Sequence, residues 1–444
     1  MMDAAAMEQK ATCTHDGALR IGVAGLGTVG AGVVSLLRAN ADLIGARAGR
    51  AIEVVAVSAR NRAVDRGLSL DGIRWHADPV SLAGDDGVDV VVEVMGGADG
   101  AARMLVEAAL AAGKPVVTAN KALVATHGAA LATLSERHSA PLAYEAAVAG
   151  GIPAIKALRE GLAGNRISRV AGILNGTCNY ILTEMRVRGL AFEAVLEEAQ
   201  RLGYAEADPS FDIDGVDAAH KLAILAALAF GRPVALGALH IEGIRHISAL
   251  DITLADQLGF RIKLLGIASR EPGGIVARVH PCMVPVGSPL AAVEGVFNAV
   301  LAEGDAVGRV VLQGRGAGSG PTASAVVADL VDIARKRGAP VWGAAPETLD
   351  TSPPLPMARH VGPYYLRLMV LDQPGVIADV TSVLRDEGIS LASMLQRGRS
   401  PGEAVPVVLV THDCEESRMR AAMTRISELP SVVEPPALIR IETL

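Results

Sequence analysis

Short apolar runs, separated by glycines and by helical patterns, dominate the first part of the chain. Such runs predict buried strands, which we place at Leu19–Ala24, Ala51–Val57, Val88–Val94 and Pro115–Thr118. Apolar residues at helical spacing between these runs predict helices from about Val29 to Ala39 and over Ala101–Ala112. Strands that alternate with helices are typical of βαβ units. We therefore expect residues 19–150 to form an α/β domain around a parallel sheet.

The pattern changes beyond Gly150. The predicted helices become longer, and the apolar stretch Leu222–Phe230 is expected to be a buried helix because it is far too short to span a bilayer. A glycine-rich stretch near residues 304–319 leads into a helix predicted over Thr322–Arg337. We expect a second domain over 151–343, in which residues 310–343 return to the first domain.

A proline-rich segment precedes the last part of the chain. Residues 344–363 contain five prolines, which prevent a regular element, so we expect a linker there. Beyond it, the pattern predicts two helices, at Gly375–Glu387 and Glu416–Leu429, and strands at Tyr365–Leu371, Val405–Thr411 and Leu438–Ile441. This order is consistent with a small α+β sandwich over 364–444.

Composition and charge narrow the functional classes. Aromatic residues make up only 3% of the chain and hydrophobic residues 50%, which favours a core of Ala, Val, Leu and Ile. The net charge of -7 provides no basic face, so we do not expect nucleic acid as a partner. Four widely spaced cysteines favour a reducing, cytoplasmic compartment over disulfides or a zinc site. Residues 1–18 have no apolar run, so we expect a flexible tail and neither a secretory signal nor a membrane segment.

A glycine-rich motif joins the first predicted strand to the first predicted helix. It reads Gly25-Leu26-Gly27-Thr28-Val29-Gly30, the pattern G-x-G-x-x-G. The first glycine permits a tight turn, the second lets the backbone approach a pyrophosphate, and the third lets helix and strand pack closely. In this βαβ context the motif favours a Rossmann-type dinucleotide site, although a plain strand–helix turn has the same pattern.

The residues after the second predicted strand bear on the choice between NAD and NADP. NAD sites usually place an acidic residue there for the ribose 2′-hydroxyl. Here the chain reads Val57-Ser58-Ala59-Arg60-Asn61-Arg62, with two arginines and no acid. Because a guanidinium pairs well with a 2′-phosphate, we expect NADP, with Ser58 and Arg60 nearest that phosphate. NAD stays possible, and a solvated arginine pair is the alternative.

The segment 202–221 is unusually acidic and ends in a lysine. Carboxylates this close repel one another unless a cation lies among them, and here they are Glu206, Asp208, Asp212, Asp214 and Asp217. Asp217 and Lys221 are four residues apart, so a helix places them on one face, where the ammonium could exchange a proton with a substrate. A surface ion pair explains that spacing equally well. A solvated loop or a helix cap is the alternative for the rest of the segment, although the apolar residues among the carboxylates argue against it. Lys121 follows a strand that should end at the cofactor crevice, where a solvated lysine is the alternative.

From about Leu19 to Arg337 the chain resembles the homoserine dehydrogenase family. The shared motifs, besides the glycine loop, are TANK at 118–121, YEAAVAGGIP at 144–153, GILNGTCNY at 172–180, GYAEADP at 203–209, DIDGVDAAHK at 212–221 and FRIKLL at 260–265. The resemblance implies the monofunctional form, an α+β catalytic and dimerisation domain over 151–343, and a homodimer or homotetramer. The implied reaction is reversible reduction of L-aspartate 4-semialdehyde to L-homoserine, a step in threonine, methionine and isoleucine biosynthesis.

The resemblance also implies roles for individual residues. Lys221 is expected to be the general acid/base, with Asp217 supporting it. Substrate contacts are expected from Glu206 to the ammonium group, from Asp212 near the hydroxyl, and from Tyr204 and Lys121, of which Lys121 also contacts the cofactor. Gly318, in the loop GRGAGSGPT, is expected beside the nucleotide. A monovalent cation, usually sodium in the family, is expected on backbone oxygens of Glu145, Val148, Gly150 and Ile152, whereas Cys178 is expected to be a packed residue.

The tail after the linker resembles an ACT domain, with the fold βαββαβ. The motifs are LDQPGV at 371–376 and EGISL at 387–391. The resemblance implies an amino-acid effector, threonine, near Asp372 and Gly375, and a dimerisation module without a ligand is the alternative. Removal of the chain after Pro363 is expected to leave activity intact. Two rival functions are another amino-acid dehydrogenase and an inactive nucleotide-bound sensor; the presence of Lys121, Glu206, Asp217 and Lys221 argues against the sensor.

Overall fold

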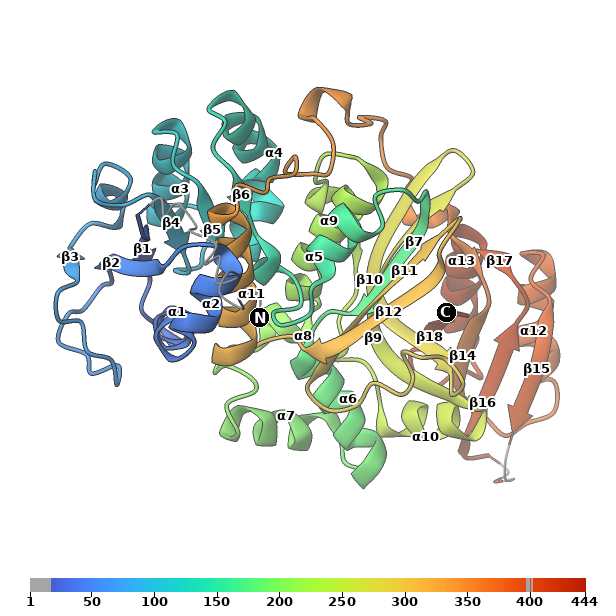
Figure 1. Ribbon diagram of the computed structural model, residues 1–444. Helices are drawn as coiled ribbons and strands as arrows, with labels where there is room; N and C mark the ends of the chain where they lie inside the picture. Colours follow the sequence, from blue (N-terminus) through green and yellow to red (C-terminus); the bar gives the residue numbers. More distant parts are fainter. Residues whose placement is uncertain (1–16, 397–399, 401) are drawn as a thin grey trace, which may run out of the picture.

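The computed structural model describes residues 17–396, 400 and 402–444. Most of the predicted tail, 1–18, lies outside these residues. Two large sheets organise the described part, and β13 (Val361–Gly362) forms a short ladder with β17 (Cys414–Glu415). In Figure 1 the first sheet and its helices lie at one end of the molecule, the tail lies at the other end, and the second domain lies between them.

The first sheet has six parallel strands, and its order is β3-β2-β1-β4-β5-β6. Their bounds are Arg74–His76, Ile52–Ser58, Leu19–Ala24, Val90–Glu93, Val116–Thr118 and Leu142–Ala143 in that spatial order. The helices are α1 (Thr28–Ala39), α2 (Ala41–Ala48), α3 (Ala101–Ala111) and α4 (Lys121–Arg137). The order reverses between β1 and β4, the switch point at which doubly wound sheets bind ligands. The predicted Rossmann-type fold is confirmed.

Helix α11 (Ser319–Ala334) brings a late part of the chain back onto the first domain. It packs against α1, and the Ser319 hydroxyl donates a hydrogen bond of 2.9 Å to the Thr28 carbonyl within the glycine motif. A Cβ at Gly32 of α1 would lie 2.4 Å from the Ser319 Oγ, so the glycine permits this close approach. Figure 1 shows α11 beside α1 and α2. The start of α11 therefore lies directly beside the proposed nucleotide loop.

The second sheet has ten strands and continues into the tail. Its main path is β12-β11-β7-β9-β10-β18-β14-β16-β15, and β8 (His240–Ile241) pairs with β10. The strands of the second domain on this path are β7 (Ile167–Ile173), β9 (Phe260–Glu271), β10 (Gly274–Pro285), β11 (Phe297–Gly304) and β12 (Gly308–Arg315). The helices of this domain are α5 (Ala154–Lys156), α6 (Gly176–Arg188), α7 (Phe192–Arg201), α8 (Ser210–Ile213), α9 (Val216–Phe230) and α10 (Ala249–Gln257). The predicted buried helix is α9, which packs against β7, β9 and β10.

The tail has the predicted βαββαβ order. Its elements are β14 (Tyr364–Leu371), α12 (Val376–Asp386), β15 (Leu391–Gln396), β16 (Ala404–Thr411), α13 (Glu416–Ser427) and β18 (Ala437–Ile441). Strand β15 has no counterpart among the predicted elements, because its side chains are mostly exposed and carry no alternating apolar pattern. The tail is not a separate sheet: β18 pairs in parallel with β10, so the sheet runs on from the second domain.

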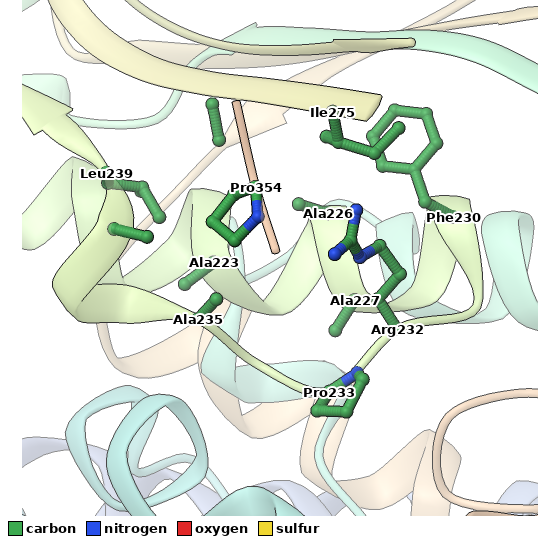
Figure 2. Close-up of a pocket in the computed structure, with 12 residues that line it drawn as sticks. Ala223, Ala226, Ala227, Phe230, Arg232, Pro233, Ala235, Leu239, Ile275 and Pro354 are labelled. Atoms are coloured by element: carbon green, nitrogen blue, oxygen red, sulfur yellow. The ribbon is translucent and has the colours of Figure 1, made fainter. Parts of the chain in front are cut away.

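The predicted linker is anchored along its length. Its prolines allow only two short turns of 3₁₀ helix, at Pro346–Thr348 and Met357–Arg359, before β13. Backbone hydrogen bonds tie Asp350 to the Gly231 carbonyl (2.9 Å) and Leu355 to the Ile275 carbonyl (2.8 Å). Figure 2 shows Pro354 facing α9 and Ile275 across a small apolar cavity of about 40 Å³. The segment therefore lies along the second domain as a strap.

One further observation concerns the helices. Among the described residues, no single helix is both long and apolar enough to cross a membrane, and α1 and α2 meet that criterion only as a pair bent by 84°.

The continuity of the sheet changes the expected effect of removing the tail. A chain that ends at Pro363 exposes the β10 edge at Cys282 and Met283 and leaves buried charged groups such as Arg278 without their partners. Breaking a buried ion pair costs about 3–5 kcal/mol. We predict that this truncation lowers the melting temperature by about 10 °C, measured by calorimetry. An unchanged melting temperature would show that the tail is an independent module.

Candidate active site

Two adjoining cavities lie between the first and second domains. The larger, of about 580 Å³, is lined by most of the acidic segment, and the smaller, of about 300 Å³, reaches Val29 of the glycine motif and Val94 after β4. Lys121, Lys221 and residues 316–318 line both cavities. A ligand held by the glycine motif would therefore meet a second ligand in the acidic cavity at these two lysines.

The glycine motif has the geometry that a dinucleotide needs. Gly25 has a φ of 98°, and a Cβ there would lie 2.7 Å from the Val94 carbonyl. A Cβ at Gly30 would lie 1.9 Å from the Gly25 carbonyl, whereas a Cβ at Gly27 would meet no atom within 4 Å. Gly27 precedes α1, whose first backbone N–H groups receive no side-chain cap. The open space at Gly27 and the helix N-terminus fit a bound pyrophosphate.

Arginines surround the end of β2. Ser58 is buried and its carbonyl accepts a hydrogen bond from Gly25, while Arg60 is exposed and pairs with no acidic group in the described residues. The sequence analysis missed Arg66, whose Nε donates to the Leu26 carbonyl at 3.0 Å. Arg62 and Arg66 also lie 5.7 and 5.8 Å from the ring centroid of Trp75. The run ARNRAVDR at 59–66 contains this third arginine, but its contact with the glycine motif depends on the fold and is not indicated by the sequence.

A buried carboxylate joins the two lysines. Asp217 and Lys221 of α9 form an ion pair with 2.8 Å between Oδ2 and Nζ, and the Lys121 Nζ lies 2.5 Å from the other oxygen, Oδ1. Lys221 also donates to the Leu174 carbonyl at 2.7 Å. Asp217 is only 2% exposed and Lys221 8%, so this is not a surface ion pair. Lys121 begins α4 in the first domain, and the cluster therefore spans the junction between the domains.

Burial and neighbouring charges shift the ionisation of this cluster in opposite directions. Burial alone would raise the pKa of Asp217, but the ammonium groups of Lys221 and Lys121 outweigh it and hold that pKa well below its ordinary value. Burial lowers the pKa of Lys221, as does the charge of Lys121, while Asp217 acts against both. Asp217 therefore stays ionised, and Lys221 releases a proton more readily than a solvated lysine.

Asn175 is a second residue that the sequence analysis did not single out. Its Oδ1 caps α6 by accepting from the Cys178 N–H, and its Nδ2 donates to Asp212 and Asp217, each at 2.8 Å. Burial and the charge of Asp217 raise the pKa of Asp212, whereas Asn175 lowers it. Asn175 lies in the motif GILNGTCNY, and an asparagine directly before a helix is a typical cap, but neither signal indicates the contact with the two carboxylates. Asn175 holds the two carboxylates side by side.

The other predicted substrate residues line the larger cavity. Glu206 and Tyr204 are exposed there, and Tyr204 packs edge-on against Tyr180 with 5.0 Å between the ring centroids. Phe211, which was not predicted, lies beneath Lys121, with 5.6 Å between its ring centroid and the Lys121 Nζ. Asp214 is the exception in the acidic segment, because it pairs with Arg245 and does not line the cavity. Cys178 is buried, which raises the pKa of its thiol well above the ordinary value, as a packed residue requires.

The loop 145–152 borders the smaller cavity. The Glu145 carboxylate accepts from the N–H groups of Ile155 and Lys156 at 2.9 and 2.8 Å, and burial, aided by Asp329, raises its pKa to about 7. The loop turns through left-handed conformations at Ala149 (φ 55°) and Gly150 (φ 49°). The side chain of Glu145 is thus engaged, and the oxygens that a cation could use in this loop are those of the backbone.

A group of possible metal ligands lies elsewhere, where β10 meets β18. His280, Cys282 and Glu442 have ligand atoms within 4.8 Å of one another. The Glu442 carboxylate is already paired with Arg278 at 2.6 Å. Burial lowers the pKa of His280 well below its ordinary value, and the charges of Arg440 and Arg278 add to that effect. Two buried guanidinium groups beside this set disfavour a cation, so we assign it to the packing of the tail on the second domain.

The predicted effector residues lie at the other end of the molecule. Gly375 has a φ of 96° and immediately precedes α12, and Asp372 precedes it in the turn after β14. The Asp372 carboxylate accepts from the Ser400 N–H at 2.9 Å, and its own N–H donates to the Glu403 carbonyl. The turn is therefore tied to the segment between β15 and β16, far from the charge cluster (Figure 1).

Three regions of the chain match models of known protein families. A model of the homoserine dehydrogenase NAD-binding domain matches residues 25–145, a homoserine dehydrogenase model matches 153–331, and an ACT domain model matches 364–431. A homoserine dehydrogenase of Pseudomonas aeruginosa is 46% identical over 96% of this chain and 99% of its own length. The crystal structure of one from Thiobacillus denitrificans has a TM-score of 0.91 at 48% identity, over 96% of this chain and 98% of that one. The structure of a hyperthermophilic archaeal homoserine dehydrogenase in complex with NADPH has a TM-score of 0.62 at 28% identity, over 72% of this chain and 98% of that one.

The role of Asn175 gives a prediction about pH and stability. Asn175→Asp retains a helix cap but adds a third carboxylate beside Asp212 and Asp217, which raises the pKa values of the acids that are not paired with a lysine. A carboxylate whose folded-state pKa is raised destabilises the fold above that pKa and ceases to do so once it is protonated. We predict a melting temperature about 5 °C below wild type at pH 8, and a smaller difference at pH 5.

Asn175→Ala is the matched control for this prediction. It removes the same hydrogen bonds without adding charge. Because Asn175 lowers the pKa of Asp212, the loss of stability in Asn175→Ala should also be larger at pH 8 than at pH 5, but the difference between the two pH values should be smaller than in Asn175→Asp. An equal pH dependence in the two variants would show that repulsion by the added carboxylate is not the cause.

Proposed function

The chain belongs to the homoserine dehydrogenase family, oxidoreductases that act on a CH–OH group, and we propose that it uses NADP to interconvert L-homoserine and L-aspartate 4-semialdehyde. One observation carries the proposal: the Lys121–Asp217–Lys221 cluster lies where a cavity from the glycine motif meets an acidic cavity. A zwitterionic amino acid needs an anionic pocket for its ammonium group. A proton-transferring group must also lie beside the nicotinamide, and the position of the cluster between the two cavities supports that role.

In the proposed mechanism Lys221 handles the proton. When bound, the nicotinamide would supply a hydride acceptor for the carbinol carbon of homoserine, or a hydride donor for the aldehyde carbon. In the oxidation the uncharged Lys221 amine accepts the hydroxyl proton, and in the reduction its ammonium donates that proton to the carbonyl oxygen. The lowered pKa of Lys221 favours release of its proton, since burial disfavours its charged form. Asp217 remains ionised throughout and keeps the Lys221 side chain in place.

The remaining residues of the acidic cavity orient the substrate in this proposal. Glu206 has an exposed carboxylate and binds the α-ammonium group, and Tyr204 forms the adjacent wall. Asp212 is held by Asn175 and lies nearest the hydroxyl. Lys121 touches both the substrate and the cofactor, because it lines both cavities.

The test of the proposal is the nicotinamide absorbance of the purified protein with homoserine and NADP. Lys221→Ala should lower kcat roughly 10²–10⁴-fold, the usual size of a general acid/base contribution, and leave the Kd for NADP nearly unchanged. Lys114→Ala is a matched control, because this lysine donates to the Asp85 carbonyl outside both cavities. Less than a threefold effect of Lys221→Ala would reject its role, and no turnover by the wild type at high enzyme concentration would reject the function.

NADP is the proposed cofactor, with Ser58 and Arg60 nearest its 2′-phosphate. Support comes from the exposed Arg60 guanidinium, which pairs with no acidic group in the part of the chain that the structure describes, and from Arg66, which lies against the glycine motif. We predict that Arg60→Glu raises the KM for NADP at least tenfold more than the KM for NAD, because only NADP carries the phosphate. Arg38→Glu, the same charge change on α1, is the control. Equal effects of Arg60→Glu on both cofactors would contradict the contact.

A monovalent cation on the backbone oxygens of Glu145, Val148, Gly150 and Ile152 is also proposed. Ala149 supports it, because a left-handed conformation is strained in a residue with a Cβ and such strain gathers at ligand sites. When bound, the ion would supply positive charge that holds this loop beside residues 315–318. Replacing sodium chloride by choline chloride should lower the melting temperature; an equal melting temperature in the two salts would argue against the site.

For the tail we propose an amino-acid effector, threonine, at Asp372 and Gly375. The turn lies at a helix N-terminus, as a carboxylate ligand requires. Asp372→Ala should abolish inhibition by threonine and leave uninhibited turnover unchanged, and persistent inhibition would place the effector elsewhere. A homodimer or homotetramer, testable by light scattering, and a cytoplasmic location stay predictions.

A further inference from the structure

The loop after β8 touches both the tail and the turn that lies between Asp212 of α8 and Asp217 of α9. A Cβ at Gly243 would lie 2.2 Å from the Ile213 carbonyl oxygen and 2.5 Å from the Asp214 Cα, so the two backbones are in direct contact there. The Ile244 N–H donates to the same Ile213 carbonyl at 2.9 Å. This turn joins α8 to α9, with Asp212 at one end and Asp217 at the other. Any shift of the loop is passed directly to the turn.

Glu242, the residue before this contact, is held by the tail. Arg440 of β18 donates to both of its carboxylate oxygens, at 2.8 and 3.0 Å, and Arg420 of α13 adds a bond of 3.1 Å. His240 lies 2.7 Å from the same carboxylate. Arg440 is 1% exposed and is itself fixed by Glu416 at 2.5 Å. The C-terminal domain therefore binds the carboxylate of Glu242 through a bidentate contact with the Arg440 guanidinium.

The backbone of Glu242 faces the opposite way. Its N–H donates to the Val279 carbonyl of β10 at 2.7 Å, and its carbonyl lies 3.4 Å from the Cβ position of Gly215. Gly215 has a φ of 84° and immediately precedes α9. One residue thus connects the tail's arginines, the central strand β10 and the start of the helix that carries Asp217 and Lys221.

We propose that Glu242 is a positioning residue for the reaction, through which the C-terminal domain sets the place of Asp212 and Asp217. This inference rests on the proposed function, because its main readout is homoserine oxidation. Packed backbones transmit small displacements, and Gly243 has no side chain to absorb them. A change in how the tail holds Glu242 therefore alters the distance between Asp217 and Lys221 and the shape of the acidic cavity.

Glu242→Gln tests the proposal, because it keeps the shape of the side chain and removes its charge. We expect kcat/KM for homoserine to fall roughly 10- to 100-fold, mainly through KM, with an unchanged Kd for NADP. If Asp217 moves away from Lys221, burial lowers the pKa of Lys221 further, so the rising limb of the kcat/KM–pH profile for oxidation should move to lower pH. Hydrogen–deuterium exchange of the backbone amides in a peptide spanning 208–220 should be faster in Glu242→Gln than in the wild type.

Two further variants frame this experiment. Arg420→Met removes one partner of Glu242 from a half-exposed position and should cause a smaller effect in the same direction, even if Glu242→Gln folds poorly. Arg425→Ala breaks ion pairs with Asp386 and Glu387 inside the tail and should leave kcat/KM, its pH profile and the exchange of 208–220 unchanged.

The failure of this inference differs from the failure of the proposed function. A wild type that does not oxidise homoserine rejects the function, while the exchange of peptide 208–220 still tests the link from Glu242 to the turn. A Glu242→Gln enzyme with wild-type kcat/KM, pH profile and exchange, whatever its melting temperature, would overturn the proposal and leave Glu242 as a structural residue only.

Discussion

The carboxylate of Asp217, buried between two ammonium groups, is the interaction on which the candidate active site depends. A single charge at 2% exposure would be costly, and the pairing of Asp217 with Lys221 of its own helix and with Lys121 of the first domain offsets that cost. The same pairing joins α4 to α9 across the domain junction. It therefore links the two domains at the crevice, keeps Asp217 ionised and leaves Lys221 as a buried lysine with a lowered pKa.

The local parts of this arrangement were predictable from the sequence, and the spatial parts were not. The glycine motif, the parallel strands and the pairing of Asp217 with Lys221 follow from patterns within a few residues. Whether that pair lies on the surface or in a crevice depends on burial, which spacing does not encode. Asn175 and Arg66 contact groups about 40 residues away along the chain, so no local pattern indicates their partners. The exact domain boundaries and the assigned residue roles stay predictions.

The tail shows the same division between local and spatial information. Its βαββαβ order was visible except for β15, and its prolines indicated a break in regular structure. The sequence did not indicate the pairing of β18 with β10, because strand edges pair through backbone groups that every sequence carries. It did not indicate the ion pair of Arg440 with Glu242 either, because the two residues are far apart along the chain. The C-terminal domain is thus built into the sheet that supports the turn between α8 and α9, which gives the coupling proposed for Glu242 a physical basis.

The most direct measurement is a crystal structure of the protein with NADP and L-homoserine bound together. The hydroxyl oxygen should lie about 3 Å from the Lys221 Nζ, with the carbinol carbon facing the nicotinamide and the ammonium group on the acidic side of the cavity. A complex in which the hydroxyl instead contacts another residue, while Lys221 stays bonded only to Asp217 and the Leu174 carbonyl, would contradict the central role of the buried cluster.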